Sequence, residues 1–138
     1  MATNSQAHTL VYPKYEVQPE DLLNFIELDW FVSSWEELHL TDQDLCALQI
    51  LIMCDPKAGK VISGTGRLRK LRYSPEGWNT GKRGAIRICY VYFEEYGVVL
   101  LCLAFRKNEL QDLSQAGKQA ARKAVARIEK QLEKRFGF

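Results

Sequence analysis

Two apolar segments, Ile86–Phe93 and Val98–Phe105, follow each other with only Glu94-Glu95-Tyr96-Gly97 between them. Both segments have the length and the β-branched and aromatic content of strands. A short connection that contains glycine is typical of a hairpin, in which two strands lie side by side and antiparallel. Any fold of this chain therefore has to include this predicted hairpin.

A third strand is predicted before the hairpin. Over residues 68–73 the pattern has a period of two, which puts Lys70 and Arg72 on one face of a strand and Tyr73 on the other. A stretch rich in turn formers, residues 74–81, connects this strand to the hairpin. Together the three strands are expected to form an antiparallel meander.

Helical patterns stand on both sides of this meander in the sequence. We expect a short strand over Phe25–Leu28, a short helix over Trp30–Leu38, a helix that Thr41 caps and that ends at Asp55, and a long helix over 114–136. The first 21 residues are polar, include two prolines and show no sustained periodicity. We therefore expect a flexible or loosely docked arm over residues 1–21 and one domain over residues 22–138.

The cysteines and the apolar runs suggest where such a protein works. At 138 residues the chain is long enough to bury a core without disulfides or metals. The four cysteines are far apart in apolar surroundings, which predicts reduced thiols in the core of a cytoplasmic protein. The amino-terminal residues lack the pattern of a secretion signal, and the longest apolar run, Val98–Phe105, is too short to cross a bilayer. We expect neither secretion nor membrane insertion.

Charge is distributed unevenly along the chain. Residues 57–87 have a net charge of +8, whereas residues 1–56 sum to −9 and residues 88–138 to +3. The basic residues of the central stretch are Lys57, Lys60, Arg67, Arg69, Lys70, Arg72, Lys82, Arg83 and Arg87. A cationic stretch inside a predicted folded region favours a phosphate-bearing partner, with nucleic acid as the first candidate.

Several kinds of chemistry are not supported by the sequence. The only histidines, His8 and His39, lie outside the basic stretch, and Cys and His show no metal-ligand spacing. The segment 77–83 is one residue short of a phosphate loop and has arginine where that loop needs Ser or Thr. We therefore expect no histidine catalysis, no metal site and no cofactor.

The two basic strands leave one catalytic possibility. Lys70, Arg72 and Arg87 would converge if their strands are neighbours. Like charges this close lower the pKa of a lysine, which suits it to act as a base, while arginine stays protonated and can hold a phosphate. Such a cluster could cleave RNA without metal, with the adjacent 2′-hydroxyl as nucleophile. The alternative is a solvated strand face that binds an acidic partner, and composition alone favours this alternative.

Three linked motifs add a family resemblance. The segments Gly64–Arg72, Gly81–Tyr90 and Phe105–Glu109, together with Asp112-Leu113-Ser114 and the preceding Asp55-Pro56…Gly59…Ile62, resemble RelE/HigB-type toxins of the RelE/ParE superfamily, from type II toxin–antitoxin systems. The resemblance covers about residues 22–115. It implies an α+β fold, with N-terminal helices packed on a small antiparallel sheet and a C-terminal helix. It also implies an mRNA endoribonuclease that acts on translating ribosomes, inhibits translation and is inhibited by a cognate antitoxin protein.

The resemblance assigns roles to individual residues. It implies that Lys70 is the base, that Arg72 stabilises the transition state, that Arg87 contacts the scissile phosphate and that Lys107 is a further catalytic cation. Further RNA contacts are expected from residues of the basic strands and loops: Arg67, Arg69, Trp78, Lys82, Arg83, Asn108 and Glu109. A tryptophan in the position of Trp78 stacks on a base or packs on the sheet, and the sequence favours neither.

Two departures from the family pattern keep other functions open. Arg67 and Ala85 stand where the family usually has glycine. One alternative is a ParE-like inhibitor of DNA gyrase, which needs no catalytic cluster. The other is an inactive domain, derived from a toxin, that only binds RNA or protein.

Overall fold

A computed structural model of the chain describes residues 10–12, 15–75, 85–106 and 114–137, and the side chains from residue 18 onward. Its elements are β1 (Leu10–Tyr12), β2 (Tyr15–Val17), the 3-10 turn η2 (Pro19–Asp21), β3 (Asn24–Glu27), α1 (Asp29–Glu37), α2 (Asp42–Cys54), β4 (Lys60–Val61), β5 (Arg69–Tyr73), β6 (Ile86–Phe93), the 3-10 turn η3 (Glu94–Tyr96), β7 (Val98–Arg106) and α3 (Gln115–Phe136).

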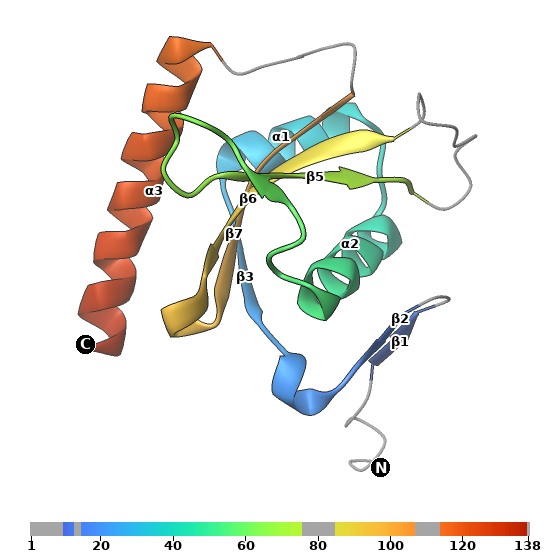
Figure 1. Cartoon of the computed structure of the whole chain (residues 1–138). Helices are drawn as coiled ribbons and strands as arrows, with labels where there is room; N and C mark the ends of the chain where they lie inside the picture. Colours follow the sequence, from blue (N-terminus) through green and yellow to red (C-terminus); the bar gives the residue numbers. More distant parts are fainter. Residues whose placement is uncertain (1–9, 13–14, 76–84, 107–113, 138) are drawn as a thin grey trace.

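One five-stranded sheet, in the order β3-β7-β6-β5-β4, organises the molecule (Figure 1). The predicted meander β5–β6–β7 is confirmed, with Ile88 opposite Leu71 on one side and opposite Ala104 on the other. β3 is parallel to β7, and β4 adds a short antiparallel edge next to β5. The α+β class, with N-terminal helices on the sheet and a C-terminal helix, is confirmed.

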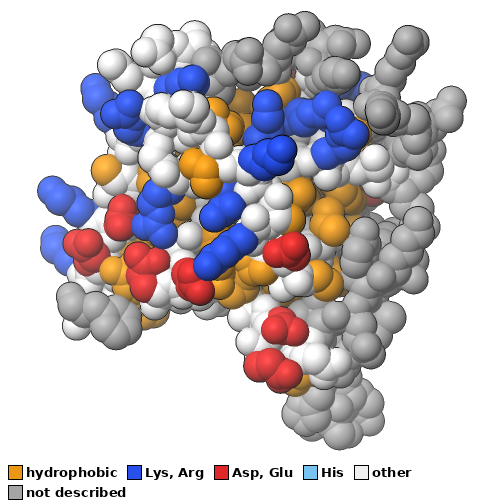
Figure 2. Space-filling model, in the orientation of Figure 1, with side chains coloured by type: hydrophobic (Ala, Val, Ile, Leu, Met, Phe, Trp, Pro, Cys, Tyr) orange, Lys and Arg blue, Asp and Glu red, His pale blue; other side chains and the backbone are white. Residues whose placement is uncertain are grey.

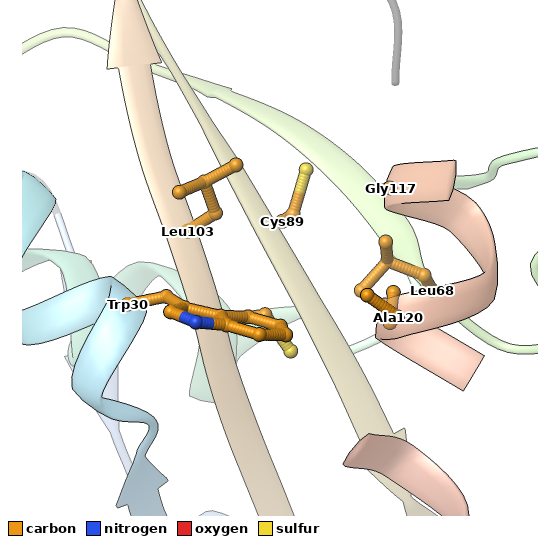
Figure 3. A pocket seen from close by; sticks show the side chains of 8 residues that line it. Trp30, Leu68, Cys89, Leu103, Gly117 and Ala120 are labelled. Carbon is orange, nitrogen blue, oxygen red and sulfur yellow. The ribbon is translucent and has the colours of Figure 1, made fainter. Parts of the chain in front are cut away.

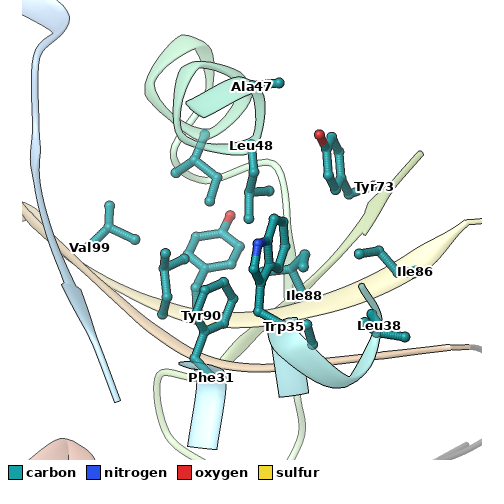
Figure 4. Packing of buried hydrophobic residues seen from close by; sticks show 13 residues of the cluster. Phe31, Trp35, Leu38, Ala47, Leu48, Tyr73, Ile86, Ile88, Tyr90 and Val99 are labelled. Carbon is teal, nitrogen blue, oxygen red and sulfur yellow. The ribbon is translucent and has the colours of Figure 1, made fainter. Parts of the chain in front are cut away.

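The first face of the sheet carries α1 and α2 and is sealed by large side chains (Figure 4). Phe31 and Trp35 of α1 stack with ring centroids 5.3 Å apart, and Trp35 also stacks on Tyr73 of β5. Tyr90 is fully buried in the same cluster. Such aromatic groups bury large areas, so this face contains most of the bulky core.

Local signals in the sequence start and position these two helices. The Thr41 side chain accepts from the backbone N–H of Asp44, and the Asp44 carboxylate accepts from the backbone N–H of Thr41, which makes a capping box for α2. In α1, the Ser34 hydroxyl accepts from the backbone N–H of Ala104, beyond the point where β3 stops pairing with β7. α1 thereby covers part of the edge of β7.

Among the described elements, α3 is the helix that packs along the second face (Figure 1). The predicted apolar stripe of this helix is confirmed, because Ala121, Val125, Ile128 and Leu132 are buried against β6 and β7. Ser114 caps the helix by accepting from the backbone N–H of Gly117. None of the helices in the described part of the chain is both long enough and apolar enough to cross a membrane.

The structure corrects one expectation and adds detail to two others. Cys89 and Cys102 are buried, but Cys46 and Cys54 are exposed, so the prediction of four core cysteines is wrong for the two that lie on the outer side of α2. The expected arm, residues 1–21, includes β1, β2 and η2, and the hairpin β1–β2 contacts α2. β4 is not among the elements that the sequence predicts.

Candidate functional site

Four cations lie on one face of β4, β5 and β6. Lys60 pairs with Lys70 across β4 and β5, and Arg72 pairs with Arg87 across β5 and β6. Opposed residues point to the same face with Cβ atoms about 4.5–5.5 Å apart, and residues two apart on a strand share that face. The four side chains are therefore neighbours. We refer to Lys60, Lys70, Arg72 and Arg87 as the cationic patch.

The alternation of β5 decides which face carries the patch. Leu71 and Tyr73 turn toward α1 and α2, where the Tyr73 hydroxyl donates to the backbone carbonyl of Asp44 at 2.9 Å. Lys70 and Arg72 then face the α3 side. The helix does not seal them, since Arg72 is exposed and Lys70 half-buried. In Figure 2, Lys and Arg side chains gather mostly in the upper half of the view and Asp and Glu in the lower half.

Arg87 has the most unusual surroundings in the patch. Its Nη1 atom is buried and has no hydrogen-bond partner among the described residues. Burial lowers the pKa of Arg87, and the nearby charge of Arg72 lowers it further. A buried donor without an acceptor costs about 1–3 kcal/mol, and a bound anion would supply the acceptor. Arg87 is therefore the strongest candidate for a phosphate contact.

The loop before β4 is held to the sheet by the side chain of Tyr90. The buried Tyr90 hydroxyl donates to the Pro56 carbonyl at 2.8 Å and accepts from the Gly59 N–H at 3.0 Å. A Cβ atom at Gly59 would lie only 2.9 Å from the Tyr90 ring and 3.1 Å from the Lys70 carbonyl. Only glycine therefore fits at this position, which directly precedes Lys60.

Arg69 faces away from the patch and secures the same loop. Its Nη1 donates to the carbonyls of Gly59 at 2.7 Å and Lys57 at 3.2 Å. This guanidinium bonds backbone oxygens on the side opposite to Lys70. In this structure its role is to hold the loop that leads into β4.

Arg67 is held by partners within the chain. Its guanidinium pairs with Glu129 of α3 at 3.2 Å and with Glu95 of η3 at 3.3 Å. It also donates to the Tyr92 carbonyl at 3.1 Å and lies over the Phe93 ring at 4.8 Å. Arg67 thus connects the start of β5 to α3 and η3.

The structure therefore sorts the predicted site residues into three groups. Lys70, Arg72 and Arg87 come together, whereas Arg67 and Arg69 bond other parts of the chain. The remaining predicted residues lie outside the described part of the chain: Trp78, Lys82, Arg83, Lys107, Asn108 and Glu109. Lys60 was not among the predicted site residues, because β4 is defined by its pairing with β5 and carries no strand pattern of its own.

No three His, Cys, Asp or Glu side chains in the described ranges lie close enough together to hold a metal ion. The patch offers cations alone. It can bind an anion, and its arginines can stabilise negative charge that develops on a phosphate.

Comparisons with known proteins give a limited result. No family model matches the chain. Among solved structures, the chain is similar to a mutant of the E. coli toxin RelE in the free state, with 14% sequence identity and a TM-score of 0.45 over 64% of this chain and 87% of that chain. This degree of similarity assigns no activity to this chain.

Proposed function

We propose that this chain is a toxin of a type II toxin–antitoxin system, of the RelE/HigB type, and that it cleaves mRNA on translating ribosomes without a metal ion. The observation that supports the proposal most strongly is the cationic patch. There a partly buried arginine, one of whose nitrogens has no partner among the described residues, lies opposite a second arginine and close to a lysine. The sequence motifs that resemble this family contain the same three residues.

The reaction requires a base, a group that holds the phosphate and a group that stabilises the transition state, and the residues of the patch can supply all three. Lys70 acts as the base that takes the proton of the 2′-hydroxyl, whose oxygen then attacks the adjacent phosphorus. Arg87 and Arg72 hold the phosphate oxygens and stabilise the charge of the transition state. The bond from phosphorus to the 5′-oxygen breaks, the leaving 5′-oxygen takes up a proton from water, and the upstream product ends in a 2′,3′-cyclic phosphate. Lys107 is proposed as a further cation of this site.

The partners follow from this activity. The substrate is mRNA in the ribosome, the site of action is the cytoplasm, and a cognate antitoxin protein restrains the enzyme. Translation stops because the message is cut. The site needs no cofactor for this reaction.

The experiment that tests the proposal is cleavage of an mRNA on purified ribosomes. A message whose nucleotide 5′ to the cut is 2′-deoxy lacks the nucleophile and should resist cleavage. Lys70→Ala should lower the cleavage rate far more than RNA binding, because it removes one cation of several but the only proposed base. Lys123→Ala, which removes an exposed cation of α3, is the matched control and should leave both quantities unchanged.

The outcomes separate the competing functions. Cleavage of the deoxy-substituted message would exclude the proposed mechanism. Equal loss of binding and rate in Lys70→Ala would show that Lys70 binds RNA and is not the base. RNA binding without any cleavage by the wild-type protein would favour a domain that only binds RNA. Intact RNA together with inhibition of DNA supercoiling by gyrase would favour the ParE-like alternative.

A further inference from the structure

An apolar pocket lies next to the cationic patch, on the same face of the sheet and beneath the first turns of α3. Its volume is about 210 Å³. Residues from α1, from β6 and β7, from α3 and from the segment before β5 line it: Trp30, Leu68, Cys89, Leu103, Gly117 and Ala120 (Figure 3). An apolar cavity of about 150 Å³ can hold a benzene ring, so this pocket has room for one flat ring.

Small side chains of α3 and one large side chain of α1 create the pocket. Gly117 and Ala120 leave space between the start of α3 and the sheet. The indole of Trp30 extends from the first turn of α1 across β7 toward Leu68 and Ala120 (Figure 3). Trp30 is 49% exposed, although Phe31 beside it is fully buried. An indole left half in solvent at a pocket wall offers a flat surface for a second ring.

The strand register joins the pocket to the patch. Cys89 of the pocket lies opposite Lys70 of the patch on β5, and Leu103 lies opposite Cys89 on β7. Arg87 is two residues from Cys89 along β6 and therefore points to the same face. Cys89 of the pocket is thus one strand spacing, about 4.8 Å, from Lys70 of the patch. Along β6 it is two residues, about 7 Å, from Arg87.

The walls of the pocket are uncharged. Burial raises the pKa of Cys89 to about 12, so the thiol is neutral at physiological pH and acts as a small apolar group. The described residues that line the pocket include no charged side chain. A ligand with a flat apolar surface and a nearby negative charge would therefore match the pocket and the patch together.

We propose that the pocket binds one nucleobase of the RNA strand whose phosphate lies on the cationic patch, and that the Trp30 indole is its stacking surface. The inference rests on the proposed function in taking RNA as the ligand. A nucleotide carries its anion and its ring one sugar apart, which fits the spacing of patch and pocket. Because the wall offers stacking rather than polar contacts to the base edges, we expect little preference for base identity.

The test measures binding without cleavage. The probe is a short fluorescently labelled 2′-O-methyl RNA, which lacks the nucleophile, and a series of the same RNA in which one base at a time is removed. Wild-type protein should bind one member of the series roughly tenfold to a hundredfold more weakly, as expected for the loss of a single stacked base. Trp30→Ala should weaken binding of the intact probe by a similar factor.

The combination of the two changes identifies the pocket. Trp30→Ala should bind the intact probe and the critical abasic probe equally well, because the stacking partner is already gone. Ala120→Leu, which fills the pocket from α3 and keeps the indole, should also weaken binding of the intact probe. Val32→Ala is the control, since Val32 is an exposed apolar residue of the same helix that does not line the pocket, and it should bind like the wild type.

Other outcomes would overturn the inference in distinguishable ways. If Arg87→Ala weakens binding but Trp30→Ala and every abasic probe do not, RNA lies on the patch and the base pocket is wrong. If Trp30→Ala keeps full RNA affinity and loses only the inhibitory antitoxin, the pocket serves a protein side chain instead. If the wild-type protein binds none of the probes and does not cleave mRNA on ribosomes, the proposed function itself fails.

Discussion

The two faces of the sheet differ in how completely they are covered. On the face of α1 and α2, stacked aromatic side chains fill the space, and the polar groups of Tyr73 and Tyr90 have partners within the chain. On the face of α3, one helix with small residues near its start leaves a pocket and a group of cations. One of these cations, Arg87, has a buried nitrogen without a partner in the described part of the chain. The first face is therefore closely packed, whereas the second leaves apolar and charged side chains partly uncovered.

The same contrast holds among the arginines near β5. Arg67 and Arg69 bond carboxylates and carbonyls of this chain, whereas Arg87 has a buried nitrogen that no described residue satisfies. Satisfied guanidiniums fix loops, and an unsatisfied one costs free energy until an anion arrives. Charge alone does not make a functional residue, because the neighbours decide what the charge is used for.

The largest expected effect tests the sealed face. Phe31→Ala removes a fully buried ring that stacks on Trp35. We expect the free energy of unfolding to fall by about 3–5 kcal/mol, the usual cost of deleting a buried aromatic side chain. Denaturant unfolding followed by tryptophan fluorescence would measure it. A loss below about 1 kcal/mol would show that this face is less well packed than its contacts indicate.

The second prediction tests the face of the sheet that carries α3 and the cationic patch, called the open face below. Arg87→Ala should lower the rate of mRNA cleavage by about 10²–10³-fold, as for the loss of one donor that stabilises a transition state. It should leave the free energy of unfolding unchanged or slightly higher, because a buried unpaired donor disappears. Cleavage on ribosomes and thermal unfolding would be measured on the same preparation, with Lys123→Ala as the control. A variant that is active but less stable would assign Arg87 to the core.

The sequence predicts the elements that have local signals. The capping box of Thr41 and Asp44, the Ser114 cap and the alternation along β5 each lie within a few residues, and each predicted element is present. β4 and the hairpin β1–β2 have too few residues to carry a pattern, and the parallel partner of β3 lies more than 70 residues away, opposite Val98 for Asn24.

The site was predictable to the same extent. Alternation was sufficient to place Lys70 and Arg72 together, and the meander brought Arg87 beside them. The partners of Arg67 are 28 and 62 residues away in the sequence, so their pairing depends on how α3 and η3 pack. The position of Trp30 at the pocket was not predictable from the sequence, because it depends on how α1 packs beside the sheet.

The third prediction concerns the connection between the two faces. Gly59→Ala would place a Cβ atom 2.9 Å from the Tyr90 ring on the sealed face and 3.1 Å from the backbone of Lys70 on the strand that carries the patch. We expect a loss of about 1–3 kcal/mol in the free energy of unfolding, as for other overpacked sites. RNA affinity should fall as well, because Lys60 and Lys70 move.

A matched control is Gly66→Ala. Its Cβ would meet nothing within 4 Å, but its φ of +84° strains any other residue. It should therefore lower stability through the backbone and leave the RNA affinity of the folded protein unchanged. If Gly59→Ala also leaves RNA affinity unchanged, the sealed face does not position the patch.

The smallest expected effect concerns Arg67, which joins the open face to α3. Arg67→Met removes its pairs with Glu129 and Glu95 while keeping an apolar side chain over Phe93. The Arg67 side chain is 35% exposed, and pairs at such positions are screened by solvent and salt. We therefore expect the free energy of unfolding to fall by about 0.5–1 kcal/mol, and this loss should shrink at high salt.

The pH dependence of this loss follows from Glu95. The pKa of Glu95 is lowered first by a hydrogen bond from its own backbone; burial opposes this with a smaller effect, and Arg67 lowers the pKa further. A carboxylate whose pKa is lowered by folding stabilises the protein above its unfolded pKa, and this contribution is lost as the pH falls through the folded pKa. The difference between Arg67→Met and wild type should therefore be largest at neutral pH and should narrow on acidification, in thermal unfolding measured across that range. Lys57→Met, which breaks the more exposed pair with Glu94 at 2.9 Å, should cost less. A pH-independent difference equal for both variants would show that Arg67 stabilises α3 through packing rather than charge.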